Sequence, residues 1–259
     1  MDHGIDLAFE AIDANETPVV MSGDGLIGAV GGAMAGVHAP LGMIPAGRGN
    51  DFARMLGLPE DAESQARLLL EGAVRRVDLL SFTLPGAEPR RVAGSVYSGV
   101  DARAGEIVDR AHWLPKKLQY PYAALRALAT YSPARYRVTV DGETREYAAA
   151  NVVVANSAYY GKGMKIAPAA TVDDGVLDVI VIEAASKLAL MRSLPKVYDG
   201  GHIELDEVTV LTGRRVEIAA DARTPVPVGG DGEPLGALPA LAGPPACVEV
   251  LPAALAVIA

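Results

Sequence analysis

Two short apolar runs, each ended by glycines and followed by a segment of helical pattern, constrain the fold of this chain more than any other feature. The first run, Pro18 to Met21, ends in Ser22-Gly23-Asp24-Gly25. The second, Leu41 to Pro45, ends in Gly47-Arg48-Gly49-Asn50. A strand, a glycine turn and a helix repeated in this order indicate a parallel sheet covered by helices.

Residues 1–84 continue this alternation. Helices are predicted over residues 26–35, 51–56 and 61–71, and a third strand over residues 74–80. Residues 82–90 then hold two prolines and a glycine, which is typical of a boundary between domains. We therefore predict a small α/β domain with a parallel sheet over residues 1–84.

The remaining residues, 85–259, are dominated by strand patterns. Strands are predicted over residues 92–97, 135–140, 144–148, 152–155, 176–182, 208–211 and 216–219, and helices over 102–110, 121–130 and 187–196. Asp141-Gly142 lies between two of these strands and indicates a hairpin. We predict a larger β-rich, sandwich-like domain whose last strand can return to the first domain, with the active site in the cleft between the domains.

Composition excludes several classes of protein. The formal net charge of −9 argues against binding to nucleic acid and against broad adsorption to anionic membranes, although a local basic patch can still reach a membrane. No apolar run approaches the roughly 18 residues of a membrane span, and the first ten residues lack the apolar core of a signal peptide. The single cysteine, Cys247, cannot form an internal disulfide. We expect a soluble, cytoplasmic protein.

The glycine turns are candidate phosphate sites. Glycines let backbone amides approach a ligand closely, and a helix N-terminus favours anions. Gly23-Asp24-Gly25 alone is a weak signal, since such a turn more often serves only to reverse the chain. Two turns at the same edge of a parallel sheet, however, would face one crevice, which is where open α/β sheets bind ligands.

The second turn belongs to a longer pattern, Pro45-Ala46-Gly47-Arg48-Gly49-Asn50-Asp51-Phe52-Ala53-Arg54. It resembles the Pro-x-Gly-Thr-x-Asn-Asp-Phe-Ala-Arg motif of the bacterial diacylglycerol kinase-like lipid kinases, relatives of the sphingosine kinases and more distantly of the NAD kinases. The family's first motif, Gly-Gly-Asp-Gly-Thr, is matched at Ser22 to Leu26. Further similarity follows in the family's order at Gly99–Ala102, Ala155-Asn156, Gly161–Met164, Ala167–Ala169, Asp173–Asp178 and Asp231–Glu233.

This resemblance implies a kinase that uses ATP and magnesium to phosphorylate a lipid hydroxyl. Asp231 would be the general base that takes the proton of that hydroxyl, and Glu233 would lie near the catalytic magnesium. From the residues alone, Asp231 is better explained by a hairpin turn, which Gly229-Gly230-Asp231-Gly232 suits. The nucleotide would be held by the two turns, at Ser22, Gly23, Asp24, Gly25, Leu26, Gly47, Arg48, Gly49, Asn50 and Asp51.

A second, structural magnesium site is also implied by the resemblance. The carboxylate of Asp174 would bind the ion together with the main-chain carbonyls of Thr171 and Val176. Hard cations prefer such oxygen ligands. An Asp-Asp-Gly turn before a strand is the competing explanation for the same residues.

The sequence departs from the family pattern at five positions. Ser22 replaces the first glycine, Leu26 the threonine and Gly28 a common asparagine. Arg48 replaces the threonine of the second turn, and Lys162 interrupts a triple glycine. An arginine can supply charge to a phosphate, whereas a leucine can offer no hydrogen bond.

Three hypotheses follow for the function. An active lipid kinase of phospholipid metabolism leads, because the segment Asn50 to Arg54 is specific to the lipid branch. A catalytically degenerate relative that binds nucleotide or lipid is the second, supported by Leu26 and Arg48. The N-terminus supports the second hypothesis as well. Family members usually begin with a strand, an Asn-Pro turn and a helix, and nothing here corresponds to that unit. We therefore expect Met1 to lie within the helix that follows it. The third hypothesis is an NAD kinase-like enzyme with a soluble substrate.

A lipid alcohol as substrate requires at least transient contact with a membrane surface. Trp113, Lys116, Lys117, Tyr120 and Tyr122 interleave aromatic and basic residues, and such segments can rest at a membrane interface. A solvated loop of the β-rich domain is the competing explanation. Peripheral contact with the membrane is therefore an expectation tied to the lipid substrate.

Overall fold

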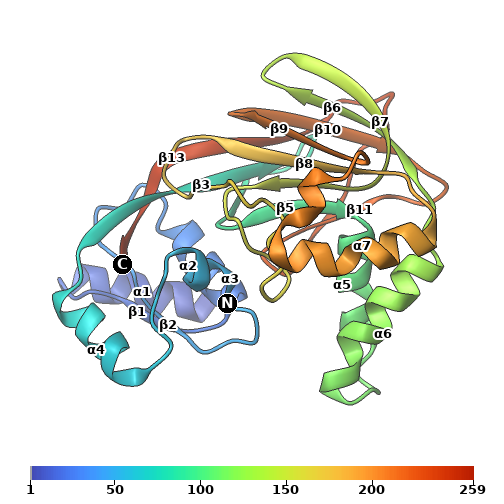
Figure 1. The fold of residues 1–259 in the computed structure, drawn as a ribbon. Coiled ribbons are helices and arrows are strands. Elements are labelled where there is room, and N and C mark those ends of the chain that lie inside the picture. The colour runs from blue at the N-terminus through green and yellow to red at the C-terminus, as the bar shows by residue number, and fades with distance from the viewer. Residues whose placement is uncertain (1) are drawn as a thin grey trace.

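The computed structural model describes residues 2–259, apart from the side chains of residues 109, 116, 117, 120 and 121. The first part of the chain forms α1 (Asp2–Asp13), β1 (Val19–Ser22), α2 (Asp24–Ala33), β2 (Gly42–Pro45), α3 (Asp51–Met55) and α4 (Ala62–Glu71). Figure 1 shows these elements, in blue and cyan, gathered at one end of the molecule, with a large sheet at the other end.

Strands β1 and β2 pair in parallel, with Val19 beside Gly42 and Ser22 beside Pro45. A glycine turn and a helix follow each strand, so the predicted α/β arrangement with a parallel sheet is confirmed. Helix α2 begins at Asp24, two residues before the predicted start, because Gly23 takes the N-cap position in extended conformation. A carboxylate in the first turn of a helix is favoured by the helix dipole.

The predicted third strand lies elsewhere. Strand β3 (Val74–Thr83) runs antiparallel to β13 (Ala246–Ile258) and to β4 (Arg90–Val92), within the large sheet. Its residues from Val77 to Phe82 are all buried, on both faces of the strand. A run of this kind looks the same in sequence whether its neighbours are parallel or antiparallel, which is why its sheet could not be read from the pattern.

The large sheet contains eleven strands and forms the predicted β-rich domain, in which the strands curl around an apolar interior (Figure 1). The strand order is β12-β11-β5-β7-β6-β10-β13-β3-β4, and β8 continues from β7 to β9. The further strands are β5 (Ser95–Gly99), β6 (Ala134–Val140), β7 (Glu143–Ala155), β8 (Leu177–Glu183), β9 (Val208–Gly213), β10 (Arg215–Asp221), β11 (Pro227–Gly230) and β12 (Glu233–Ala237).

Two local predictions can be compared with these strands. Asp141 and Gly142, both with positive φ, connect β6 to β7 as the expected hairpin. The strands predicted over 144–148 and 152–155 are one continuous strand, β7, which bends where its pairing with β8 shifts between Ala149 and Asn151. The helices of this part are α5 (Val100–Arg110), α6 (Lys116–Ala129) and α7 (Lys187–Asp199), with a 3-10 helix, η1 (Gly201–Glu204).

Strand β13 connects the two parts of the molecule. Its pairing with β3 shifts between Leu251 and Leu255, and beyond the shift Val257 forms a parallel bridge with Leu41. Leu255 and Val257 are buried in the core of the first part. The last strand therefore packs under the α/β elements as well as in the large sheet.

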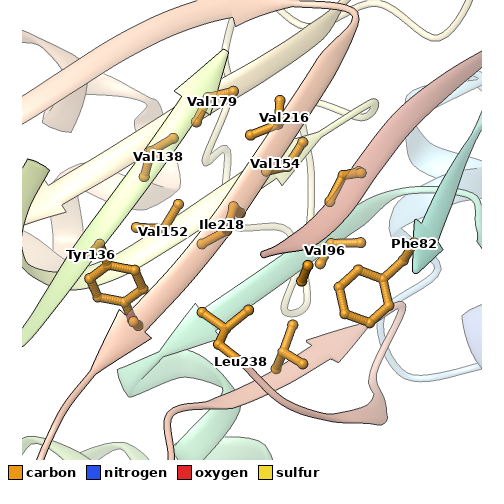
Figure 2. Close-up of a cluster of buried hydrophobic side chains, with 14 of the residues drawn as sticks. Phe82, Val96, Tyr136, Val138, Val152, Val154, Val179, Val216, Ile218 and Leu238 are labelled. Atoms are coloured by element: carbon orange, nitrogen blue, oxygen red, sulfur yellow. The ribbon is translucent and has the colours of Figure 1, made fainter. Parts of the chain in front are cut away.

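The interior of the large sheet is built mainly from β-branched side chains. Figure 2 shows Val138, Val152, Val154, Val179 and Val216 packed together with Phe82 and Tyr136. Full burial of one such side chain contributes roughly 1.5–3 kcal/mol. Val228 of β11 and Leu235 of β12 belong to the same cluster, so the hairpin that they flank rests on a rigid frame.

None of the helices within residues 2–259 combines the length and the apolar composition that crossing a membrane requires.

Candidate functional site

The two glycine turns lie back to back. A Cβ atom built on Gly47 would be 2.3 Å from the Cα atom of Gly23, and one built on Gly23 would be 3.0 Å from the Cα atom of Gly47. Real Cβ atoms are essentially never this close to backbone. The absence of side chains at both positions therefore allows the two strand–turn–helix units to meet, as the parallel sheet predicted.

Hydrogen bonds fasten the second turn to the first. The backbone amide of Phe52 donates to Oδ1 of Asp24 at 3.1 Å. Within the second turn, the amide of Gly47 donates to Oδ1 of Asn50 at 2.8 Å, and Asn50 itself has a left-handed conformation, φ 53°. Asparagine tolerates that conformation better than most residues. Asp24 and Asn50 thus set the shape of the turns from which amides could approach a ligand.

Asp51 joins the turns to the β-rich domain. Only 8% of this residue is exposed, and its carboxylate accepts hydrogen bonds from the amides of Lys162 and Gly163 at 2.8 and 2.7 Å. Arg54 donates to it from Nη1 at 2.6 Å. Burial raises the pKa of Asp51, and the two amides and the Arg54 charge oppose that rise. Both carboxylate oxygens thus accept from protein donors, and Asp51 fastens the second turn to residues 162–163.

Basic side chains lie beside the turns. Arg48 is exposed, and its charge is close enough to lower the pKa of Lys162, although burial lowers that pKa more. Arg54 lies over the ring of Tyr159, 5.8 Å from its centroid. Two neighbouring positive side chains, such as Arg48 and Lys162, favour the binding of an anion between them. The sequence singled out Arg48 and treated Lys162 only as an interruption, and the structure brings the two together.

Asp231 lies at the tip of the β11–β12 hairpin. Asp231 and Gly232 have φ angles of 49° and 87° and form the two-residue turn between Gly230 and Glu233, as the residue pattern alone suggested. The side chain does more than form the turn. Its carboxylate accepts hydrogen bonds from the amides of Ala93, Gly94 and Ser95, at 2.6, 2.9 and 3.3 Å.

The same carboxylate faces the first glycine turn. A Cβ atom built on Gly28 of α2 would be 3.1 Å from Oδ2 of Asp231. Burial raises the pKa of Asp231 to about 6, against the effect of the three amides, and the Asp24 charge adds to the rise. The hairpin of the β-rich domain and helix α2 of the α/β domain therefore meet at Asp231.

Asn156 supports the loop that holds Asp231. Its side chain is fully buried, and Nδ2 donates to the carbonyls of Ala93 at 3.0 Å and of Asp78 at 2.9 Å. The amide of Asn156 donates to the carbonyl of Gly94 at 2.9 Å. Asn156 was noted in the sequence only as part of a family motif. Its role in positioning residues 93–95 depends on contacts with segments more than 60 residues away.

Glu233 follows the turn and lines a small pocket of about 30 Å³ between α5 and the β11–β12 hairpin. Tyr97, Ala102, Glu106 and Gly229 line it as well. Glu233 is separated from Asp231 by one residue and pairs across the turn with Gly230. The structure therefore places the two predicted catalytic residues in one hairpin.

A buried polar network lies behind this pocket and was assigned no role from the sequence. Asp101 accepts hydrogen bonds from Nδ2 of Asn151 and from the hydroxyl of Tyr160. Burial raises the pKa of Asp101, and these two donors oppose the rise. The ring of Tyr160 packs edge-on against Tyr97, with centroids 5.7 Å apart. The network thus fixes the start of α5 and one wall of the pocket.

The predicted metal residues lie in an exposed loop before β8. Oδ1 of Asp174 accepts from the amide of Val176 at 2.9 Å, as a turn would require. Burial raises the pKa of Asp178 to about 6, and the Asp174 charge adds to the rise, so the two carboxylates are close enough to repel each other. In the described part of the chain, no group of three or more His, Cys, Asp or Glu side chains could hold a metal ion. A hard cation here would have the Asp174 carboxylate and the main-chain carbonyls of Thr171 and Val176 as oxygen ligands, which is the kind of donor that such ions prefer.

Comparisons with known proteins agree with this geometry. The model of the diacylglycerol kinase catalytic domain matches residues 1–82, and that of the YegS C-terminal NAD kinase beta sandwich-like domain matches residues 94–259. A diacylglycerol kinase of Mycobacterium tuberculosis is 30% identical over 250 residues, which are 95% of this chain and 79% of the relative. The chain belongs to the diacylglycerol kinase-like lipid kinases. The family suggested by the sequence motifs is thereby confirmed.

Other lipid kinases of this family are more distant. A diacylglycerol kinase of Bacillus subtilis is 25% identical over 231 residues, covering 85% of this chain and 72% of the relative. The crystal structure of a diacylglycerol kinase from Bacillus anthracis superposes with a TM-score of 0.70 at 21% identity, over 98% of this chain and 80% of that one. The second similarity concerns the fold alone.

The structure explains two departures of this chain from the family motifs. Leu26 packs against α1, where a Cβ atom built on Gly4 would be 3.1 Å from its Cδ1 atom. Its side chain therefore contributes to the core of the α/β domain. Gly28 leaves the space that the Asp231 carboxylate occupies. A side chain at position 28 would press on that carboxylate.

Proposed function

We propose that this lipid kinase transfers the γ-phosphate of ATP to the hydroxyl of a diacylglycerol-like lipid, in the cytoplasm and at the membrane surface. One observation carries the proposal. The carboxylate of Asp231 lies against α2, directly after the first glycine turn, with both oxygens oriented by the amides of residues 93–95. A base held beside a phosphate site is what transfer to a hydroxyl requires.

The nucleotide would bind at the two glycine turns. Ser22 to Leu26 and Gly47 to Asp51 would surround its phosphates, and the first-turn amides of α2 have no partner within the helix. Arg48 and Lys162 would supply positive charge where the family usually has a threonine and a glycine. The charge of an arginine on a phosphate can replace the lost hydrogen bond of the threonine.

Asp231 would act as the general base. Its carboxylate would accept the proton of the lipid hydroxyl while the hydroxyl oxygen forms a bond to the γ-phosphorus and the bond from that phosphorus to ADP breaks. Glu233, in the same hairpin, would hold a magnesium ion, which offsets the charge of the phosphates when bound. Asp174, with the carbonyls of Thr171 and Val176, would hold a second, structural ion.

The rate of transfer should fall in acid. The pKa of Asp231 is about 6, so the carboxylate is ionised at neutral pH and becomes protonated below that value. A protonated carboxyl cannot accept the proton of the substrate, so kcat/KM should fall about tenfold for each pH unit below the pKa. A pH–rate profile measured between pH 5 and 8 tests this, with the nucleotide saturating at each pH, since acid protonates phosphates as well. A flat profile through pH 6 would remove Asp231 from the role of base.

The deciding assay measures transfer of labelled phosphate from ATP to a panel of lipid alcohols in mixed micelles, with and without magnesium. We expect magnesium-dependent transfer to a lipid and none to NAD. Transfer to NAD in preference to every lipid would favour the soluble-substrate hypothesis. Nucleotide binding without any transfer would favour a degenerate binding protein.

A further inference from the structure

Helix α7 carries an apolar stripe on its outward side. Leu188, Met191, Leu194 and Tyr198 are spaced three or four residues apart and so lie on one face of the helix. Between 40% and 56% of each of these four residues is exposed. Figure 1 shows α7 beside the curled sheet, together with α5 and α6 and away from the α/β elements.

The packing of the domain does not account for this stripe. The face of α7 that meets the protein consists of Ala189, Leu190, Ser193 and Val197, of which only Val197 is buried. An amphipathic helix normally turns its more apolar face inward. In α7 most of the large apolar side chains point outward, which indicates that something other than water covers them.

Helix α6, beside α7, has a similar stripe. Leu118 and Leu125 are 53% and 56% exposed, and Tyr122 lies between them on the same face. The ring of Tyr122 packs edge-on against Trp113, which is 71% exposed. The two helices are joined where Nζ of Lys187 donates to the carbonyl of Ala129. The side chains of Lys116, Lys117 and Tyr120, which the sequence also suggested for this surface, lie outside the described residues.

The charge around these stripes has the opposite sign to that of the whole chain. Segments 111–130 and 184–198 together hold six Lys and Arg and no Asp or Glu, in a chain of net charge −9. Within the described residues, Arg192 and Lys196 form no ion pair with a carboxylate. The carboxylates nearest in sequence to α7 are Asp199, its last residue, and Glu183 before it. Both lie beyond the ends of the apolar stripe.

We propose that the outward face of α7, with Trp113 and Tyr122 beside it, docks on an anionic lipid bilayer. Leu188, Met191, Leu194 and Tyr198 would enter the boundary between headgroups and acyl chains, while Arg192 and Lys196 meet lipid phosphates. Exposed apolar side chains flanked by Lys and Arg, with Trp and Tyr at the edge, are the composition of such interfaces. Each basic residue near an anionic surface adds to the attraction. The inference concerns binding and does not depend on phosphate transfer.

Vesicle co-sedimentation tests the proposal, without nucleotide or magnesium. Vesicles of equal parts phosphatidylglycerol and phosphatidylcholine are compared with vesicles of phosphatidylcholine alone. We expect the protein to prefer the anionic vesicles, and the triple variant L188S/M191S/L194S to lower the partition coefficient at least tenfold. R192Q/K196Q should lower it less and should weaken its dependence on salt. The matched control is L70S/V74S, which changes two residues that are 86% and 58% exposed, in α4 and at the start of β3, and it should bind like the wild type.

Three results would overturn the proposal. The first is equal vesicle binding by the wild type and the triple variant. The second is a wild type that does not prefer vesicles with phosphatidylglycerol. The third is a wild type that is dimeric in solution and a triple variant that is monomeric but still binds vesicles. The last would show that a second copy of the chain covers the stripe. Transfer of phosphate to a short-chain acceptor below its micelle concentration is measured in parallel. Equal rates of the wild type and the triple variant with this acceptor, together with unequal vesicle binding, would support docking as a property separate from catalysis.

Discussion

Phosphate transfer by the Asp231→Asn variant should be about a thousandfold slower than by the wild type, while its affinity for nucleotide changes little. General base catalysis contributes roughly 10²- to 10⁴-fold to a rate, and an amide cannot take the proton of the hydroxyl. The nucleotide would contact the glycine turns rather than this side chain. kcat from the micelle assay and nucleotide binding by calorimetry measure the two effects.

Asparagine also has one acceptor oxygen where aspartate has two, so the loop of residues 93–95 loses at least one hydrogen bond in this variant. Thermal unfolding of the variant therefore accompanies the kinetics, and retained nucleotide binding shows that the fold persists. Asp206→Asn, at an exposed position before β9, is the matched control and should leave kcat unchanged. A folded Asp231→Asn variant with near-normal turnover would show that another group is the base.

Nucleotide affinity should fall at least a hundredfold in the Gly47→Ala variant. The added methyl group would lie 2.3 Å from the Cα atom of Gly23 and 2.8 Å from Oδ1 of Asn50. Backbone cannot move out of the way as a flexible side chain can, so the two turns must separate. Separation would misplace the amides of both turns at once and would weaken the bond from Phe52 to Asp24. Calorimetric titration with ATP measures the loss.

The matched control for this variant is Gly243→Ala, in the loop between β12 and β13. A Cβ atom there would meet its nearest neighbour, the carbonyl oxygen of Ala240, at 3.6 Å, which is an ordinary contact. This control should bind nucleotide like the wild type. Unchanged affinity in Gly47→Ala would mean that the nucleotide does not rely on the contact between the two turns.

Most of the fold could be predicted because its signals are local. The alternation of apolar runs and glycine turns predicted β1, α2, β2 and α3, and the Asp141-Gly142 pair predicted the hairpin between β6 and β7. Several strands of the β-rich domain were found with ends that differ by a few residues, as strand 74–80 extends to Thr83. The strand predicted over 92–97 is divided between β4 and β5, and β11 and β12 were not predicted. The sequence pattern placed strand 74–80 in the parallel sheet, whereas it lies in the large antiparallel sheet. Its partner there, β13, comes more than 160 residues later, beyond the reach of any local pattern.

The candidate site divides in the same way. The turns and Asp231 were given roles from motifs, whereas Asn156 and Asp101 stood in motifs without a role, and the proximity of Arg48 to Lys162 was not predicted. No spacing in the sequence connects Asn156 with Ala93, since the contact depends on how β5 and β7 pair in the sheet. Sequence patterns therefore indicated which residues carry the chemistry but not which residues hold them.

By itself, the sequence determined the class of the fold and the two glycine turns, because these depend on backbone freedom and on side-chain periodicity within a few residues. Its motifs also carried the resemblance to the family. Only the tertiary structure decided that Asp231 is held by residues 93–95, that Asp51 holds residues 162–163, and that most of the large apolar side chains of α7 face outward. Each of these depends on contacts between segments that are distant in the chain, or on which face of a helix meets the sheet. Such contacts are set by the order and pairing of the strands, which no local pattern specifies.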